Sequence, residues 1–284
     1  MWNLPAPPGF QGLHPDKPLR IYQRHLPHWR QEGATYFVTF RLGDSLPQAK
    51  LDELAGLRKE WERLHPPPQP NAAWEKLARE MAERVERWLD QGHGSCVLKH
   101  PHLAAHVVNT LHHFDTPSRT AAESGTAFPG RHPESATGSE SEMEEKTEEA
   151  TAKEGRPTGE SNTITPRYEL GCYFVMANHV HAIVRPLDGQ TQPLENIVGS
   201  WKQFSSGKFN KAQGTKRDGI KRKVDLWQDE TFDRIIRDEE HLWRVIQYIG
   251  RNPDNAHVPR DSCPLWIRPE WESLGWTFEW RRGT

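Results

Sequence analysis

The chain has 284 residues, of which 35% are hydrophobic and 27% charged, and its mean hydropathy is -0.86. This length allows one large domain or two small ones. Its three cysteines lie far apart with no C-x-x-C pair, which argues against a disulfide framework or a structural zinc site and favours a reducing compartment. No apolar run approaches the length of a membrane span and no signal peptide is visible, so we expect a cytoplasmic protein without a membrane partner.

The formal net charge of -2 hides an uneven distribution of charge along the chain. Residues 115–165 contain eleven of the 39 acidic residues but five of the 37 basic ones, which leaves 28 acids and 32 bases elsewhere. A mild basic excess outside this segment permits a nucleic-acid partner. Since residues 115–166 also contain almost no large apolar side chain, we expect them to form a disordered acidic insertion.

The first part of the chain predicts one strand followed by helices. Apolar and polar residues alternate over 35–42, where β-branched and aromatic residues dominate, as in a strand. Three helices are expected next, over about 47–64, 74–88 and 102–114, because their apolar residues recur at steps of three and four.

The part after the insertion opens with a predicted β-hairpin. Residues 168–176 and 179–184 are strongly apolar, and the two residues between them suffice for a tight turn. A helix over 194–204 and a basic loop over 208–223 should follow.

The last predicted helix begins at Asp238, a good N-cap, and ends near Asn252, because Pro253 restricts the residue before it. The order of these elements fits an α+β fold, for which we expect a ferredoxin-like antiparallel sheet with packed helices. Four segments are expected: the first part of one domain over 1–114, the insertion over 115–166, the rest of the domain over 167–256, and a Trp-rich tail over 257–284 without predicted structure.

His179 and His181 lie on the second strand of the hairpin, so their side chains point to the same face and could share a metal ion. A chain with 15 histidines contains such a pair by chance, and His100-Pro101-His102 is a second one. The proline and the helix start beside it indicate a turn there rather than a ligand strand. The spacing of His179 and His181 alone leaves two interpretations open: a metal site, or two histidines on an exposed face of the sheet.

Tyr248 and Asn252 lie one turn apart on the last predicted helix. They share one flank of its apolar stripe, so both side chains should project from the border of the core. Helix geometry alone also fits a half-buried tyrosine and an ordinary helix-end asparagine. The stripe itself consists of Leu242, Val245, Ile246 and Ile249.

Taken in order along the chain, several motifs resemble one family. His179-Val180-His181 looks like the HUH motif, two histidines that flank a hydrophobic residue. Other stretches resemble the C-terminal signature of the REP-associated tyrosine transposases, which are single-tyrosine HUH transposases: Trp227-Gln228, Ile235-Ile236-Arg237, and Tyr248-Ile249 followed by Asn252-Pro253. The stretch from Arg24 to Trp29 and the strand from Tyr36 to Leu42 resemble the start of that family, so the resemblance spans about residues 20–114 and 167–256.

The sequence departs from the family pattern at three places. Ala177 stands where relatives often have proline, and Phe232 stands where they often have tyrosine, although Phe232 is not the expected nucleophile. The acidic insertion is not part of the family pattern.

The resemblance implies an enzyme that cleaves and rejoins single-stranded DNA near hairpins through a 5′-phosphotyrosine intermediate. Tyr248 would be the nucleophile, and Mg²⁺ or Mn²⁺ would be held by His179, His181 and Asn252. The expected partner is single-stranded DNA with a hairpin, and the protein could act as a monomer or a homodimer.

Basic residues after the hairpin are candidates for phosphate contacts, although a solvated basic loop is the alternative. They are Lys202, Lys208, Lys211, Lys216, Arg217, Lys221, Arg222 and Lys223. Two other functions remain open: a non-catalytic DNA-binding regulator derived from a transposase, and an RNA-binding ferredoxin-like module. Tyr36, Phe37 and Phe40 do not match the pattern of such RNA-binding strands, which disfavours the second.

Overall fold

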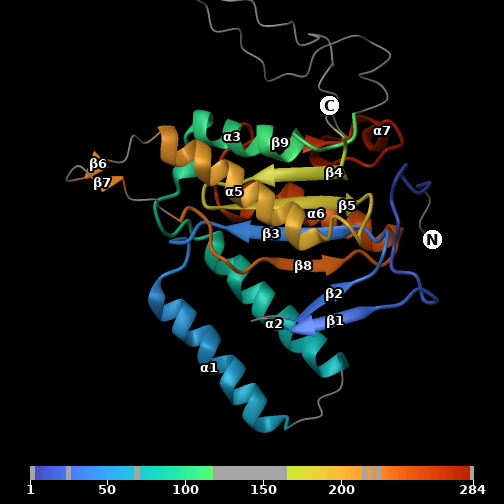
Figure 1. Cartoon of the computed structure of the whole chain (residues 1–284), viewed down its shortest axis with the longest axis horizontal. Helices are drawn as coiled ribbons and strands as arrows, with labels where there is room; N and C mark the ends of the chain where they lie inside the picture. Colours follow the sequence, from blue (N-terminus) through green and yellow to red (C-terminus); the bar gives the residue numbers. More distant parts are fainter. Residues whose placement is uncertain are drawn as a thin grey trace, which may run out of the picture.

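The computed structural model describes residues 4–23, 27–66, 71–117, 165–212, 216–217, 220–221 and 225–281. These residues form an α+β fold, as predicted, around an antiparallel sheet of five strands in the order β8-β3-β5-β4-β9 (Figure 1). The strands are β3 (Tyr36–Arg41), β4 (Tyr168–Val175), β5 (His179–Pro186), β8 (Phe232–Ile235) and β9 (Leu265–Ile267). Within these parts of the chain, no helix is long and apolar enough to cross a membrane.

The two faces of the sheet are covered by different helices. Tyr36, Val38 and Phe40 of β3 point to one face, where they pack with α3 (Pro101–His112) and α5 (Leu194–Ala212). Phe37 points to the other face and packs with α6 (Glu239–Asn255) and α7 (Pro269–Glu272). Both faces are therefore buried, and we call them the α5 face and the α6 face.

A pair of long helices extends past the β8 edge of the sheet (Figure 1). α2 (Asn71–Leu89) buries large side chains such as Trp74 and Trp88. α1 (Gln48–Leu64) buries none of its residues completely, so its predicted apolar stripe is only half covered. The smaller elements are the hairpin of β1 (Arg20–Gln23) and β2 (Pro27–Arg30), the hairpin of β6 (Lys216–Arg217) and β7 (Ile220–Lys221), and the short helices η1 (Val97–Lys99), η2 (Arg260–Ser262) and η3 (Glu279–Arg281).

Two predicted boundaries differ from the structure. α5 continues to Ala212, so Lys208 and Lys211 lie on a helix and not in the expected loop. α6 continues through Pro253, where we predicted its end. Proline lacks the N–H that would bond to the carbonyl of Ile249. The side-chain amide of Asn252 approaches that carbonyl at 3.5 Å, which compensates part of the loss.

The segment after residue 257, for which the sequence predicts no structure, continues the fold. Its strand β9 extends the sheet at the β4 edge, and Trp271 and Trp276 are fully buried in the core of the α6 face. Gly171 makes this packing possible, because a β-carbon there would meet the Trp271 ring at 2.1 Å.

The start of the expected insertion also lies within the fold. Asp115 is buried and pairs with Arg268 at 2.6 Å, which joins the end of the α3 segment to the segment after β9. Residues 118–164, most of the expected insertion, lie outside the described residues.

Candidate metal and nucleophile site

The two histidines of the HUH-like motif are fully buried on the α6 face. His179 is 1% exposed and His181 is 0% exposed, so the alternative of two histidines on an exposed sheet face is wrong. Their Nε2 atoms lie 3.0 Å apart. Burial lowers the pKa of His179 to about 4 and lowers the pKa of His181 as well, so both rings are neutral at pH 7.

A hydrogen bond at the far side of each ring fixes its orientation. The amide nitrogen of Asn178 donates to the carbonyl of Leu89, and its oxygen lies 2.8 Å from Nδ1 of His179. An amide oxygen only accepts, so Nδ1 of His179 carries the proton and its Nε2 presents a lone pair. Nδ1 of His181 lies 2.8 Å from the hydroxyl of Thr39, which can donate or accept.

Asn252 of α6 supplies a third polar atom at the same point. Its Oδ1 lies 3.3 Å from Nε2 of His181. Its amide nitrogen donates to the backbone carbonyl of Tyr248 at 2.9 Å, which turns the oxygen toward the histidines. Pro253 leaves the carbonyl of Ile249 without its backbone donor, and the same amide nitrogen of Asn252 approaches that carbonyl at 3.5 Å. The proline therefore helps to orient the oxygen of Asn252, a candidate ligand atom.

The three converging atoms fit a divalent cation. Nε2 of His179 and Oδ1 of Asn252 both accept, so they require either a proton on Nε2 of His181 or a cation between them. An octahedral metal with bonds of about 2.1 Å places neighbouring ligand atoms about 3.0 Å apart, close to the observed distances. No group of three or more His, Cys, Asp or Glu in the described chain could hold a metal, so the set depends on Asn252.

Tyr248 lies beside this cluster in the same chain. Its ring centroid is 5.5 Å from that of His181 and 5.9 Å from that of Phe37, both in edge contacts. Its hydroxyl donates a hydrogen bond to Glu86 of α2. Burial and the charge of Glu86 raise the pKa of Tyr248, so the resting side chain is a protonated phenol.

Glu86 is a site residue that the sequence did not indicate. Burial raises its pKa to about 7, while the hydrogen bond from Tyr248 and the charge of Arg234 oppose that increase. The only signal in the sequence is a carboxylate between the apolar residues Val85 and Trp88 of a predicted helix. That signal does not say which distant residue the carboxylate would meet.

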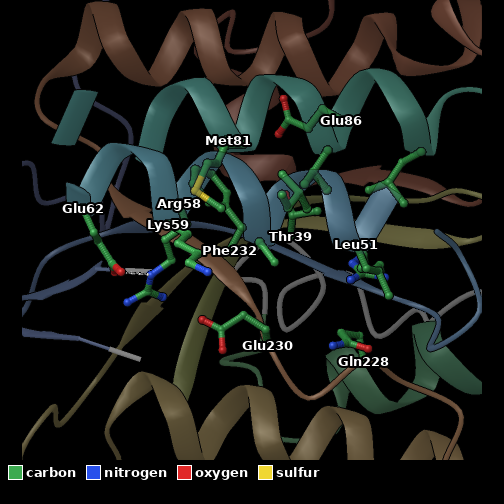
Figure 2. Close-up of a pocket in the computed structure, with 16 residues that line it drawn as sticks. Thr39, Leu51, Arg58, Lys59, Glu62, Met81, Glu86, Gln228, Glu230 and Phe232 are labelled. Atoms are coloured by element: carbon green, nitrogen blue, oxygen red, sulfur yellow. Dashed lines mark hydrogen bonds and ion pairs between the residues drawn. The ribbon is translucent and has the colours of Figure 1, made fainter. Parts of the chain in front are cut away.

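A cavity of about 510 Å³ opens beside the site, between α1, α2 and the strands β3 and β8 (Figure 2). Thr39 and Glu86 both line it, so it reaches the partners of His181 and of Tyr248. The cavity therefore touches one hydrogen-bond partner of each half of the site.

Three of the predicted phosphate contacts have described side chains, and these three do not gather at this site. Lys202 donates to the backbone carbonyls of Gln228 and Asp229, so it holds the segment before β8. Lys208 and Lys211 are exposed on α5, which covers the face of the sheet opposite the histidines. The side chains of Lys216, Arg217, Lys221, Arg222 and Lys223 lie outside the described residues.

Comparison with known proteins gives one similarity. A scan against protein-family models and a search of curated proteins found no match. Among solved structures, the chain is similar to one described as "Structure of the REP associates tyrosine transposase bound to a REP hairpin", with 12% sequence identity and a TM-score of 0.26. The similarity covers 82% of this chain and 72% of that chain. With so low a TM-score, the function has to be argued from the geometry of the site.

Proposed function

We propose that the protein is a single-tyrosine HUH transposase that cleaves and rejoins single-stranded DNA near hairpins. Tyr248 is its nucleophile, and His179, His181 and Asn252 hold Mg²⁺ or Mn²⁺. The observation that carries this proposal is the convergence of two distant segments, β5 and α6, on one buried point. The ring of Tyr248 and the amide of Asn252 both contact His181, although each lies 67 or more residues after His181 in the sequence.

The topology supports the same proposal. The strand order β8-β3-β5-β4, with a helical crossover before β4 and another before β8, is the order expected of a ferredoxin-like sheet. We therefore propose a ferredoxin-like core, with β9 added at one edge.

The residues around the site have distinct roles in the proposed reaction. Asn178 and Thr39 hold the imidazole rings in place. Glu86 accepts the proton of the Tyr248 hydroxyl, because it bonds to that hydroxyl and its pKa of about 7 suits a general base. The bound cation would neutralise charge on the phosphate and on the leaving oxygen.

The oxygen of Tyr248 forms a bond to phosphorus, and the bond from phosphorus to the 3′-oxygen breaks with its electron pair on that oxygen. The 3′-oxygen takes a proton from water, which leaves a 5′-phosphotyrosine and a free 3′-hydroxyl. In the rejoining step a 3′-hydroxyl gives its proton to water and its oxygen forms a bond to phosphorus. The bond from phosphorus to the tyrosine oxygen breaks, and Glu86 returns its proton to that oxygen. The ring of Tyr248 contacts that of His181 within the same chain, which supports the use of Tyr248 in its own chain's site.

The test is formation of a covalent adduct. A labelled single-stranded oligonucleotide with a hairpin is incubated with the protein and Mn²⁺ and run on a denaturing gel. We expect an adduct with the unaltered chain and none with Tyr248→Phe. Folded protein that gives no adduct, or equal adduct from both proteins, contradicts the proposal.

One observation favours a second candidate, a DNA-binding regulator that does not cleave. The hydroxyl of Tyr248 is bonded to Glu86 and half-buried, so it is not displayed to solvent. A shift on a native gel without an adduct on the denaturing gel would support this candidate. The RNA-binding module is disfavoured, because helices cover both faces of the sheet and Tyr36, Phe37 and Phe40 are at most 2% exposed.

A further inference from the structure

Arg41 lies near the site and has no acidic partner among the described residues. It lies opposite His179 in the pairing of β3 with β5, so both side chains leave the sheet on the α6 face. Its guanidinium donates to the hydroxyl of Ser45 at 3.0 Å, and it forms no ion pair with any residue that the structure describes. Burial lowers its pKa to about 10. A half-buried charge of this kind is costly unless an anion binds it.

Arg41 also lines the 510 Å³ cavity, whose walls combine apolar, aromatic and polar side chains (Figure 2). Leu54 of α1 and Met81 of α2 contribute apolar surface on the helix side, and Phe232 of β8 contributes an aromatic ring. Gln228 adds an amide that can donate and accept hydrogen bonds. The volume lies within the range of about 300–1,000 Å³ that is typical of small-molecule sites.

Several other charges at the cavity are paired, whereas Lys59 of α1, which also lines it, has no acidic partner among the described residues. Glu62 pairs with Arg58 at 2.8 Å, and Glu230 pairs with His28 at 3.2 Å. Among the described residues that line the cavity, Arg41 and Lys59 are therefore the cations without an acidic partner. Arg41 is the one that the strand register places opposite His179.

We propose that this cavity binds one unpaired nucleotide of the DNA strand, next to the cleaved phosphodiester. The base packs against Leu54, Met81 and Phe232, and its phosphate binds Arg41. This inference rests on the proposed function and names a substrate subsite for it. It also gives a reason for the preference for single-stranded DNA, because a base held in a duplex cannot enter such a cavity.

Binding is tested without cleavage in the Tyr248→Phe protein. In a series of hairpin oligonucleotides, 2-aminopurine replaces one base at a time along the strand. Its fluorescence is recorded when the protein binds. We expect a change at one position next to the cleavage site and its loss in Leu54→Trp, which fills the cavity. Glu80→Trp, an exposed position on α2, is the control and should keep the change. No change at any position while anisotropy shows binding would overturn the proposal, as would a change that Leu54→Trp leaves intact.

Arg41 is tested in the same assay. We expect Arg41→Ala to weaken binding about tenfold, while Arg244→Ala, an exposed arginine of α6, leaves it unchanged. Equal affinities would contradict the role of Arg41.

Strands that lack one base distinguish a failure of the base-binding cavity from a failure of the proposed function. Stacking of one base supports about a tenfold effect, so an abasic nucleotide at the identified position should slow adduct formation about tenfold. Leu54→Trp should slow the reaction of the intact strand but not that of the abasic strand. If the chain forms no adduct yet the fluorescence results hold, the proposed function fails and the binding site stands. If adduct forms equally well with abasic nucleotides at every position, the binding site is wrong.

Discussion

The two faces of the central sheet are built from alternate residues of the same strands but differ in chemistry. On β5, Val180, Ala182 and Val184 enter the core of the α5 face, which consists of apolar and aromatic side chains. His179 and His181 of the same strand point to the α6 face, where they meet Asn252. Both faces therefore supply packing, and the α6 face also contains a cluster of buried polar groups.

The difference matters because buried polar groups lower stability unless their hydrogen bonds are satisfied. Each imidazole bonds to a neighbour at its Nδ1 and to another polar atom at its Nε2. Apolar residues would fill this space at lower cost, as they do on the α5 face. Places where a sequence departs from the most stable solution are often functional sites. The comparison predicts that substitutions in the polar cluster of the α6 face change activity and that substitutions in the core of the α5 face change stability.

The largest expected effect is that of Tyr248→Phe on the α6 face. Loss of the nucleophilic oxygen should reduce covalent adduct by more than about 1,000-fold. The free energy of unfolding should fall by no more than about 1.5 kcal/mol, because one hydrogen bond is lost. The adduct is measured on denaturing gels and stability by urea unfolding. An unchanged adduct would show that the α6 face does not hold the nucleophile.

The largest expected loss of stability comes from Trp201→Ala on the α5 face. Trp201 is 1% exposed and its indole donates to the hydroxyl of Tyr168 at 2.8 Å. We expect the free energy of unfolding to fall by about 3–5 kcal/mol. Phe204→Ala, on the same helix at 52% exposure, is the control and should change it by less than about 0.5 kcal/mol. Similar losses for both would contradict the packing role of this face.

The sequence predicts a structural feature of this protein when the residues that encode the feature are close together in the chain. The strand β3, the hairpin of β4 and β5, and the stripe of α6 follow from the spacing of apolar residues, and the structure confirms them. The order of the motifs also predicts that the histidines, Tyr248 and Asn252 belong to one site. The strands and helices among these features can be predicted because each is encoded within a few consecutive turns or strand residues.

The features that the sequence did not predict are contacts between distant elements. Glu86 reaches Tyr248 only because α2 passes the edge of the sheet, and no periodicity encodes that crossing. Arg41 reads as an ordinary end of a strand until its register opposite His179 is known. The tryptophans after residue 257 show no clear periodicity, since Trp271 packs on a bulge in β4 rather than along a helix face.

A smaller effect is expected from Glu86→Gln, which should slow cleavage without abolishing the covalent adduct. Loss of the general base should slow single-turnover cleavage about 100-fold at pH 8. The rate of the unaltered chain should fall as the pH drops through about 7, the pKa of Glu86, whereas the variant should lack this step. Arg234, Glu83 and Asp90 carry the other charges that act on this carboxyl. Glu83→Gln, an exposed position on the same helix, should retain the step.

Stability provides an independent check on Glu86. Its pKa is higher in the folded chain than its ordinary value of 4.5, so folding favours the neutral carboxyl. That contribution is present below pH 4.5 and is lost as the pH rises through about 7. Glu86→Gln, which stays neutral, should therefore be more stable than the unaltered chain at pH 8 and about equally stable at pH 4. A variant that is less stable at pH 8 would show that the carboxylate serves mainly to hold the fold.

The smallest expected effect is the stabilisation by Mn²⁺, which tests whether the polar cluster is a metal site. At a free concentration ten times its Kd, Mn²⁺ should raise the free energy of unfolding by about 1.4 kcal/mol. His181→Ala should abolish this increase. His100→Ala should retain it, because His100 belongs to the other H-x-H sequence and lies exposed at the start of α3.

The pH dependence makes this last test specific to a buried site. Protons compete with a metal for imidazole only near the pKa of the ring. Because burial lowers the pKa of His179 to about 4, the stabilisation by Mn²⁺ should be nearly the same at pH 6 as at pH 8. An exposed histidine pair with an ordinary pKa of 6.5 would lose much of it at pH 6. If the stabilisation fades at pH 6, the cation binds elsewhere on the chain, and the polar cluster of the α6 face has to be explained without it.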